Sequence, residues 1–241
     1  MHTTTSTSLI VGGTSGIGLA TARKLAADGG HVHVAARGQE RLDELAVSDP
    51  ALHGHRVDGA DHRAVGALAA SIAPIDHLIV TLSGSEGIGP FAQLDLAMLR
   101  RAFDAKFWAH ITTVQAALPS LAPDASISLV GAITAHTGMA GTAGVAAINA
   151  AVEALVKPLA VELAPMRVNA VSPGFVDTPW WDGMPEEERR AYFEATAQVL
   201  PARQIATAEQ VAEAVALVAR NPNLTGTTIE TDAGLRLVSV G

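Results

Sequence analysis

A run of glycines near the start of the chain constrains its fold more than any other feature. The apolar run Leu9–Val11 leads directly into Gly12-Gly13-Thr14-Ser15-Gly16-Ile17-Gly18, and a helical pattern follows. Gly12 permits a tight turn, Gly16 lets the backbone approach a pyrophosphate, and Gly18 allows close packing of helix on sheet. The amide groups at the start of such a helix attract phosphate. This order of strand, glycine turn and helix predicts a dinucleotide site.

Short apolar runs alternate with longer helical patterns along the rest of the chain. Continuous apolar runs are typical of parallel strands buried on both faces, so the alternation predicts a doubly wound α/β (Rossmann) fold, with residues 1–241 as a single domain. A (β/α)₈ barrel is the alternative, and the glycine pattern after the first strand disfavours it. The predicted strands are Leu9–Val11, Val32–Ala36, Leu52–Val57, Leu78–Leu82, Ile127–Val130, Val168–Val171 and Thr227–Thr231. The predicted helices are Ile17–Ala27, Glu40–Ala46, Arg63–Ile72, Leu96–Leu118, Ala143–Leu163 and Ala208–Ala219.

Residues 177–203 interrupt this alternation before the last predicted helix. The segment contains two adjacent tryptophans and then Pro185, which precedes three glutamates. Proline suits the first position of a helix, and negative charge there faces the positive end of the helix dipole. We therefore expect a small lid with its own helix over the site.

Composition excludes several classes of function. The 16 basic and 24 acidic residues give a net charge of −8, which disfavours nucleic-acid binding because that requires basic surface. The absence of cysteine excludes disulfides and thiolate sites, and the histidine spacing predicts no metal site. The N-terminus lacks a signal-peptide pattern, and the longest uncharged stretch, Ala125–Val152, is too polar for a membrane span. We expect a soluble cytoplasmic protein with a small-molecule substrate and no membrane partner.

The chain resembles the short-chain dehydrogenase/reductase (SDR) superfamily over essentially its whole length. The G-x-x-x-G-x-G spacing, the stretch 167–178 (RVNAVSPGFVDT) and Asp232-Ala233-Gly234 carry the resemblance. It implies that Asp58 faces adenine, that Val176 and Thr178 contact the nicotinamide carboxamide, and that two long helices form a homodimer or homotetramer. The implied cofactor-binding residues are Gly12, Thr14, Ser15, Gly16, Ile17, Gly18, Arg37, Asp58, Gly59, Leu82, Ser83, Pro173, Gly174, Val176 and Thr178.

The end of the second predicted strand indicates which dinucleotide binds. An acidic residue there would accept hydrogen bonds from the ribose 2′-hydroxyl and repel a 2′-phosphate, but the chain has Ala36 followed by Arg37. A guanidinium pairs well with phosphate, and Thr14 and Ser15 could add hydroxyl donors. The sequence predicts NADP(H) over NAD(H); the alternative is that Arg37 is a solvated loop cation.

The resemblance fails at the usual catalytic residues. SDR enzymes commonly use an Asn–Ser–Tyr–Lys set, in which tyrosine exchanges the proton with the substrate. Those four positions fall on Lys106, Ala132, Val145 and Asn149, and the single tyrosine, Tyr192, lies in the lid. The usual acid–base chemistry is therefore absent.

Two of the departures suggest a compensating arrangement. The amide and the ammonium have exchanged places, so we hypothesise that Lys106 and Asn149 hold the nicotinamide ribose and a water. Lys106 would also donate a proton if burial lowers its pKa; its alternative role is a surface or ion-pairing lysine. His136 is a third candidate, because imidazole titrates near neutral pH; its alternative role is a solvated loop residue.

Three functions fit these residues. The first is an atypical NADP(H)-dependent oxidoreductase that reduces an iminium or carbonyl substrate without a tyrosine acid. The second is a catalytically silent NADP(H)-binding protein, and the third is a non-redox isomerase or lyase on the same fold. For substrate binding we expect a pocket wall formed by Phe107, Met139, Trp180 and Trp181. The alternative role of the two tryptophans is to pack the lid onto the body of the protein.

Overall fold

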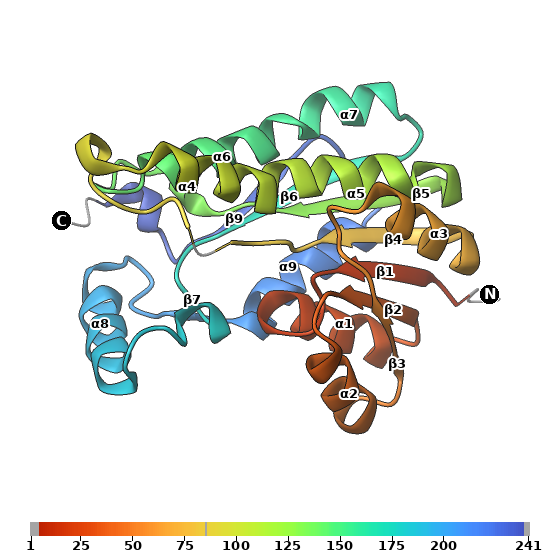
Figure 1. Cartoon of the computed structure of the whole chain (residues 1–241), viewed down its shortest axis with the longest axis horizontal. Coiled ribbons are helices and arrows are strands. Elements are labelled where there is room, and N and C mark those ends of the chain that lie inside the picture. The colour runs from red at the N-terminus through yellow and green to blue at the C-terminus, as the bar shows by residue number, and fades with distance from the viewer. Residues whose placement is uncertain (1–4, 85, 239–241) are drawn as a thin grey trace.

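A seven-stranded sheet, parallel throughout, forms the middle layer of the protein in the computed structural model, which describes residues 5–84 and 86–238. The strand order is β3-β2-β1-β4-β5-β6-β9, so the order reverses on either side of β1 (Figure 1). The strands are β1 (Thr7–Val11), β2 (His31–Ala36), β3 (Leu52–Arg56), β4 (Ile75–Val80), β5 (Leu121–Val130), β6 (Arg167–Pro173) and β9 (Thr228–Thr231). The doubly wound fold predicted from the sequence is confirmed.

Helices cover both faces of the sheet. One face packs against α1 (Gly16–Ala27), α2 (Gln39–Ser48) and α9 (Ala208–Arg220). The other packs against α3 (His62–Ile72), α5 (Ala109–Ala117), α6 (Ala143–Ala154) and α7 (Val156–Glu162).

Strand β1 illustrates why its sequence reads as a continuous apolar run. Leu9 and Val11 belong to the buried cluster on the α5 face, whereas Ile10 belongs to the cluster on the α1 face. All three side chains are almost completely buried. Because successive strand residues point to opposite faces, a strand covered on both sides needs apolar residues at every position.

Several predicted elements differ from the structure in their bounds or continuity, and β5 begins at Leu121 rather than Ile127. The predicted helix Leu96–Leu118 consists of α4 (Leu96–Phe103), a π-helical segment η2 (Asp104–Trp108) and α5. The predicted helix Ala143–Leu163 divides into α6 and α7, since Pro158 in the first turn of α7 has no amide to donate to the carbonyl of Ala154. The fourth strand ends at Val80 rather than Leu82; directly after it, the Thr81 amide donates to the carbonyl of Val11, and the Thr81 side chain donates to the carbonyls of Val11 and Gly12.

The segment expected to form a lid contains η5 (Pro179–Trp181) and α8 (Glu186–Val199). A second, two-stranded sheet of β7 (Val176–Asp177) and β8 (Ala206–Thr207) joins its two ends. The helix begins directly after Pro185, as its sequence predicted. In Figure 1 this segment lies at the end of the molecule toward which β4, β5 and β6 run.

Candidate active site

The glycine turn between β1 and α1 provides space for a phosphate group. Gly12 and Gly16 have φ angles of +98° and +49°, which favour glycine. A Cβ atom on Gly18 would overlap the carbonyl oxygen of Gly12. The N-cap residue of α1, Ser15, makes no side-chain capping bond, so the first-turn amides are available to bind an anion. These properties fit the pyrophosphate of a dinucleotide.

The residues expected around the adenosine lie at the carboxyl ends of β2, β3 and β4. Gly59 and Leu82 are in close contact, since a Cβ on Gly59 would lie 2.6 Å from Leu82 Cδ1. Asp58 accepts a hydrogen bond from the amide of Ala60 at 3.0 Å, which orders the turn after β3. Arg37, directly after β2, is exposed, and Ser83, in the loop after β4, is exposed as well. The fold thus brings these segments, distant in sequence, to one edge of the sheet.

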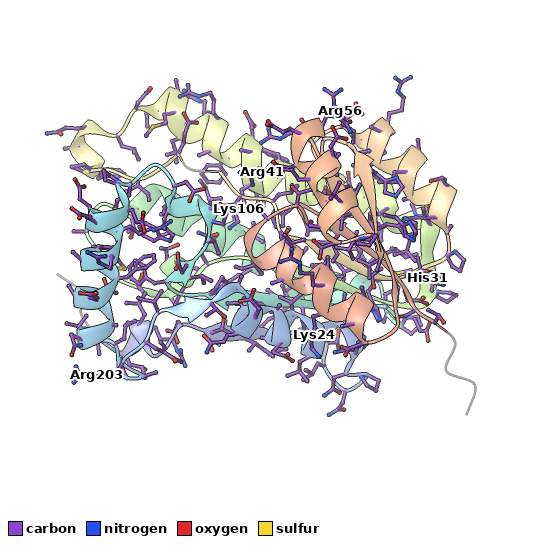
Figure 2. All side chains as sticks on the ribbon, turned by 90° about the horizontal axis from the view of Figure 1, so that it is seen from below. Lys24, His31, Arg41, Arg56, Lys106 and Arg203 are labelled. Atoms are coloured by element: carbon purple, nitrogen blue, oxygen red, sulfur yellow. The ribbon has the colours of Figure 1, made fainter. Side chains whose placement is uncertain are left out.

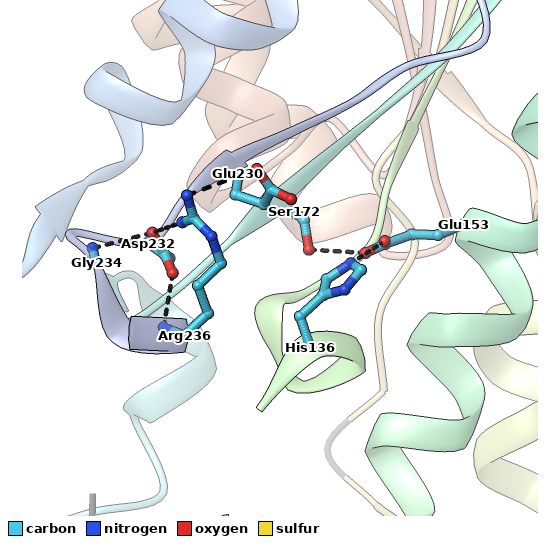
Figure 3. A network of polar contacts seen from close by, with 7 residues as sticks. All are labelled: His136, Glu153, Ser172, Glu230, Asp232, Gly234 and Arg236. Atoms are coloured by element: carbon cyan, nitrogen blue, oxygen red, sulfur yellow. Dashed lines mark hydrogen bonds and ion pairs between the residues drawn. The ribbon is translucent and has the colours of Figure 1, made fainter. Parts of the chain in front are cut away.

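The residues expected around the nicotinamide lie after β6. Pro173 ends that strand and Val176 opens β7. Thr178 lies against the glycine turn, since a Cβ on Gly16 would lie 3.3 Å from Thr178 Cβ. Gly174 faces Asp232, whose buried carboxylate receives the side chain of Arg236 at 2.6 Å. Asp232 also accepts hydrogen bonds from the amides of Gly234 and Arg236, which order this turn (Figure 3).

Lys106 is buried inside the protein. Its residue is 8% exposed, and Nζ donates to the carbonyl oxygen of Gly131 at 3.1 Å. Figure 2 shows it toward the middle of the molecule, whereas His31 and Arg203 lie at opposite ends. Burial lowers the pKa of the Lys106 ammonium to about 8, while the carboxylate of Glu153 acts in the opposite direction. A buried lysine with this pKa loses its proton at a lower pH than an exposed lysine does.

His110 supports the segment that carries Lys106. Its ring is fully buried, and Nδ1 donates to the carbonyl oxygen of Lys106 at 2.8 Å. Burial lowers the pKa of His110 to about 3, with Lys106 acting in the same direction, so the ring is neutral. The contact fixes the π-helical segment at Lys106; π-bulges of this kind occur frequently at functional sites.

Asn149 lies on α6 and is also buried. Its Nδ2 donates to Thr134 Oγ1 and to the carbonyl of Val145, both at 2.9 Å. Its Oδ1 is buried and has no hydrogen-bond partner within residues 5–84 and 86–238. Since unsatisfied buried acceptors are costly, this oxygen is suited to receive a hydrogen bond from a bound molecule.

His136 forms a pair with a residue that the sequence analysis missed. His136 Nε2 lies 2.6 Å from Glu153 Oε2, and Ser172 Oγ donates to Glu153 Oε1 at 2.7 Å (Figure 3). The Glu153 side chain is only 8% exposed, whereas that of His136 is 40% exposed. Strand β6, helix α6 and the 3₁₀ turn η4 (Ile133–His136) thus meet at one carboxylate.

Glu153 left a signal in the sequence. It is the one acidic residue of α6, it ends the uncharged stretch Ala125–Val152, and it follows Asn149 by four residues. Residues four apart share a helix face. A lone carboxylate on the face of a candidate site residue therefore marks the same site.

The positions expected for the usual serine and tyrosine carry no acid–base group. Ala132 lies directly before η4, and Val145 lies in the first turn of α6. Tyr192 lies in α8 instead, where its ring is 5.8 Å from that of Phe175 and 5.7 Å from that of Trp181. Burial raises the pKa of Tyr192, which makes it a weaker acid.

The residues expected to line the substrate pocket divide into two groups. Trp180 Nε1 donates to the carbonyl of Gly84 at 3.2 Å, so the lid contacts the loop after β4. Trp181 Nε1 donates to the carbonyl of Val176 at 3.1 Å. Met139 packs against the cluster of Ile133, Leu200 and Leu235 near the lid. Phe107, however, packs against the main core on the α5 face.

Comparison with known proteins identifies the family. A family model described as enoyl-(acyl carrier protein) reductase matches residues 11–236. The chain is 33% identical over 247 residues to cis-4-hydroxycyclohexanecarboxylate dehydrogenase of Sinomonas cyclohexanicum, covering 95% of this chain and 96% of the relative. The chain belongs to the short-chain dehydrogenase/reductase superfamily. Members of the SDR superfamily are oxidoreductases that use NAD(P)(H).

Solved structures of SDR proteins superpose closely on the chain. A small-chain dehydrogenase in complex with NADPH is 32% identical with a TM-score of 0.84, covering 97% of this chain and 100% of the other. The MalC reductase/Diels–Alderase of Malbranchea aurantiaca is 27% identical with a TM-score of 0.87, covering 97% and 96%. Over the residues that the structure describes, no cluster of three or more His, Asp or Glu side chains could hold a metal ion.

Proposed function

We propose that this SDR protein is an NADP(H)-dependent reductase of small imine, iminium or carbonyl compounds that works without a tyrosine acid. The observation that carries the proposal is a pair of buried polar groups, Lys106 and Asn149, which bond to the segment directly after β5. Among the residues that the structure describes, Lys106 Nζ makes one hydrogen bond, to Gly131, and Asn149 Oδ1 makes none. Both retain capacity for a bound molecule, and neither contributes to an apolar core.

The glycine turn and its neighbours fit the cofactor. The first-turn amides of α1 would bind the pyrophosphate, and Thr178 beside Gly16 would hold the carboxamide. Arg37, aided by Thr14 and Ser15, would pair with the 2′-phosphate. A related structure that carries NADPH supports this choice. When bound, NADPH supplies the hydride.

The chain's own residues would supply orientation and proton transfer. Lys106 and Asn149 would hold the nicotinamide ribose and a water molecule. His136, half-exposed and paired with Glu153, would exchange the proton with the substrate. Trp180, Trp181 and Met139 would form one wall of the substrate pocket and exclude water from it. An iminium substrate already carries its charge and needs no protein acid.

Two other functions remain candidates. A catalytically silent NADP(H)-binding protein would explain the missing serine and tyrosine, but it would not need His136 and Glu153 at the site. A non-redox reaction on this fold gains support from the relative whose structure is described as a reductase/Diels–Alderase. We retain the reductase because the features that fit nicotinamide are present together.

We also propose a homodimer or homotetramer in the cytoplasm. The helical stretch Ala143–Glu162 is long and apolar enough to span a membrane by length and composition, with a mean hydropathy of 1.5 and 28% of its most apolar window buried. Beside it, α4 and η2 form a groove of about 540 Å³ lined by four apolar and two charged residues, namely Leu96, Leu99, Arg100, Phe103, Asp104 and Trp108. Association of two copies would cover this surface.

The experiment combines binding with a substrate screen. The dissociation constants of NADPH and NADH are measured by fluorescence, and NADPH oxidation is then followed with carbonyls and cyclic imines. We expect tighter NADPH binding and turnover of at least one class. Gly18→Ala should weaken binding more than tenfold, since its Cβ would overlap Gly12, whereas Gly38→Ala has open space around it. Binding without turnover would favour the silent protein, and no binding would refute the nucleotide site.

A further inference from the structure

Glu153 occupies a place where a carboxylate is costly. Its side chain is 8% exposed, and removing an ion from water costs several kcal/mol unless partners compensate. Both oxygens have a partner: Oε1 accepts from Ser172 Oγ at 2.7 Å and Oε2 lies 2.6 Å from His136 Nε2. An apolar residue would suffice if the position only had to pack against the sheet.

The backbone opposite Glu153 leaves room for this carboxylate. A Cβ on Gly131 would lie 2.8 Å from Glu153 Oε1 and 3.2 Å from its Cγ. The carbonyl of the same glycine accepts the hydrogen bond of Lys106. Gly131 therefore lies between the carboxylate and the ammonium, and any larger residue would displace Glu153.

The carboxylate determines which nitrogen of His136 keeps a proton. An ionised carboxylate only accepts hydrogen bonds, so His136 Nε2 must carry the hydrogen that it shares with Glu153. In the neutral ring Nδ1 is then the free nitrogen, and in the charged ring it holds the proton that can leave. The ring is 40% exposed, so solvent can restore that proton.

We propose that Glu153 is a positioning residue, which holds His136 so that Nδ1 is the atom that gives the proton to the reduced substrate. This inference rests on the proposed reductase function. The carbonyl oxygen or neutral imine nitrogen forms a bond to the proton from Nδ1 as the N–H bond breaks. Bound NADPH would supply the two electrons with its hydride and would be left as NADP⁺. His136 is left neutral with its Nε2 proton still shared with Glu153.

Charged groups near the pair act on it from two further elements. Lys106 in η2 interacts electrostatically with Glu153. The turn η6 (Leu235–Leu237), which packs on η4, carries Arg236, but Asp232 binds its guanidinium at 2.6 Å. Glu153 is therefore a carboxylate that contacts His136 and also interacts electrostatically with Lys106.

The first test reads the His136 tautomer directly. Long-range ¹H–¹⁵N NMR of the full protein with NADPH distinguishes the protonated nitrogen in each neutral histidine, and His136→Gln assigns the signal. We expect Nε2–H in the wild type and a mixture of tautomers in Glu153→Gln. Gly131→Ala, which displaces the carboxylate without removing its charge, should have the same effect. Glu162→Gln makes the same replacement at an exposed glutamate of α7 and should leave the His136 tautomer unchanged.

The second test separates proton donation from general damage. With 3,4-dihydroisoquinoline as probe, Glu153→Gln should reduce kcat at least tenfold and leave the NADPH dissociation constant unchanged. With its N-methyl iminium salt, which needs no proton, kcat should change less than twofold.

An unchanged His136 tautomer in both Glu153→Gln and Gly131→Ala would overturn the inference. Equal loss of kcat with both probes would overturn it as well, because Glu153 would then be merely structural. The tautomer experiment needs no turnover, so its result is independent of the proposed function. Lack of turnover in the wild type would count against the reductase, and a changed tautomer would still support the placement of His136 by Glu153.

Discussion

Lys106 is the residue where burial and charge oppose each other most directly. Its ammonium donates a hydrogen bond to Gly131, and burial lowers its pKa from the ordinary value of 10.5 to about 8. A natural protein retains such a destabilising group where function requires it. Because the folded-state pKa lies below the unfolded value, the folded protein releases this proton first as the pH rises.

This order of proton release predicts a pH-dependent stability. Below about pH 8 Lys106 is protonated in both the folded and the unfolded protein, so folding bears the full free-energy cost of burying the charged ammonium. Between about pH 8 and 10.5 the folded protein releases the proton and this cost falls. The stability of the wild type relative to Lys106→Met should therefore rise by about 2 kcal/mol between pH 7 and pH 9.5. Urea unfolding at the two pH values measures this change, with Lys157→Met as the exposed control. A pH-independent difference would contradict the buried position of Lys106.

The sequence predicted the roles of some site residues and missed the role of another. Gly12, Gly16 and Gly18 were readable because each meets a backbone requirement that other residues meet poorly. Glu153 was missed because its role depends on His136 and Ser172, which lie 17 and 19 residues away in sequence and meet it only in the folded chain.

At the scale of elements, the strands and most helices followed from their periodicity, whereas their interruptions did not. The pattern Leu96–Leu118 predicted a continuous helix, but it contains the π-helical segment Asp104–Trp108. One contact there is the buried His110 bonded to the carbonyl of Lys106. A bond of this kind depends on tertiary packing and leaves no periodic signal in the sequence.

The lid segment is the element expected to control cofactor release. Trp180 joins it to the loop after β4 through one hydrogen bond, to the carbonyl of Gly84 at 3.2 Å. Trp180→Phe keeps an aromatic wall but loses this bond, which is worth about 1 kcal/mol. We expect NADPH to dissociate several-fold faster, as measured by stopped-flow fluorescence. Trp108→Phe, outside the lid, is the control. Equal rates of NADPH dissociation in the two variants would show that the Trp180–Gly84 hydrogen bond does not control release of the cofactor.

At the scale of the whole molecule, the sequence predicted the doubly wound sheet because its covered strands are apolar at successive positions. It did not predict which outer surfaces would remain apolar. Leu96, Trp108 and Val161 are 61%, 53% and 80% exposed, on the same side of the sheet as the groove on α4. Exposed apolar surface of this kind favours the proposed association of copies.

The proposed oligomer gives a direct prediction. Val161→Asp places a charge in the exposed apolar face of α7 without disturbing the core. We expect the wild type to sediment as a dimer or tetramer and the variant to shift toward the monomer in analytical ultracentrifugation. Val47→Asp, at an equally exposed valine on α2, should sediment as the wild type does. A monomeric wild type would refute the oligomer.

The central claim is that this SDR protein reduces its substrate without a tyrosine acid. Replacing the single tyrosine, Tyr192→Phe, produces a chain with no phenol at all and preserves the aromatic packing of the lid. The most direct measurement is NADPH oxidation by the wild type and this variant with the imine or carbonyl found in the screen. We predict that kcat agrees within twofold, since Tyr192 lies outside the group of Lys106, Asn149, His136 and Glu153. Loss of turnover in Tyr192→Phe with NADPH binding intact would contradict the account.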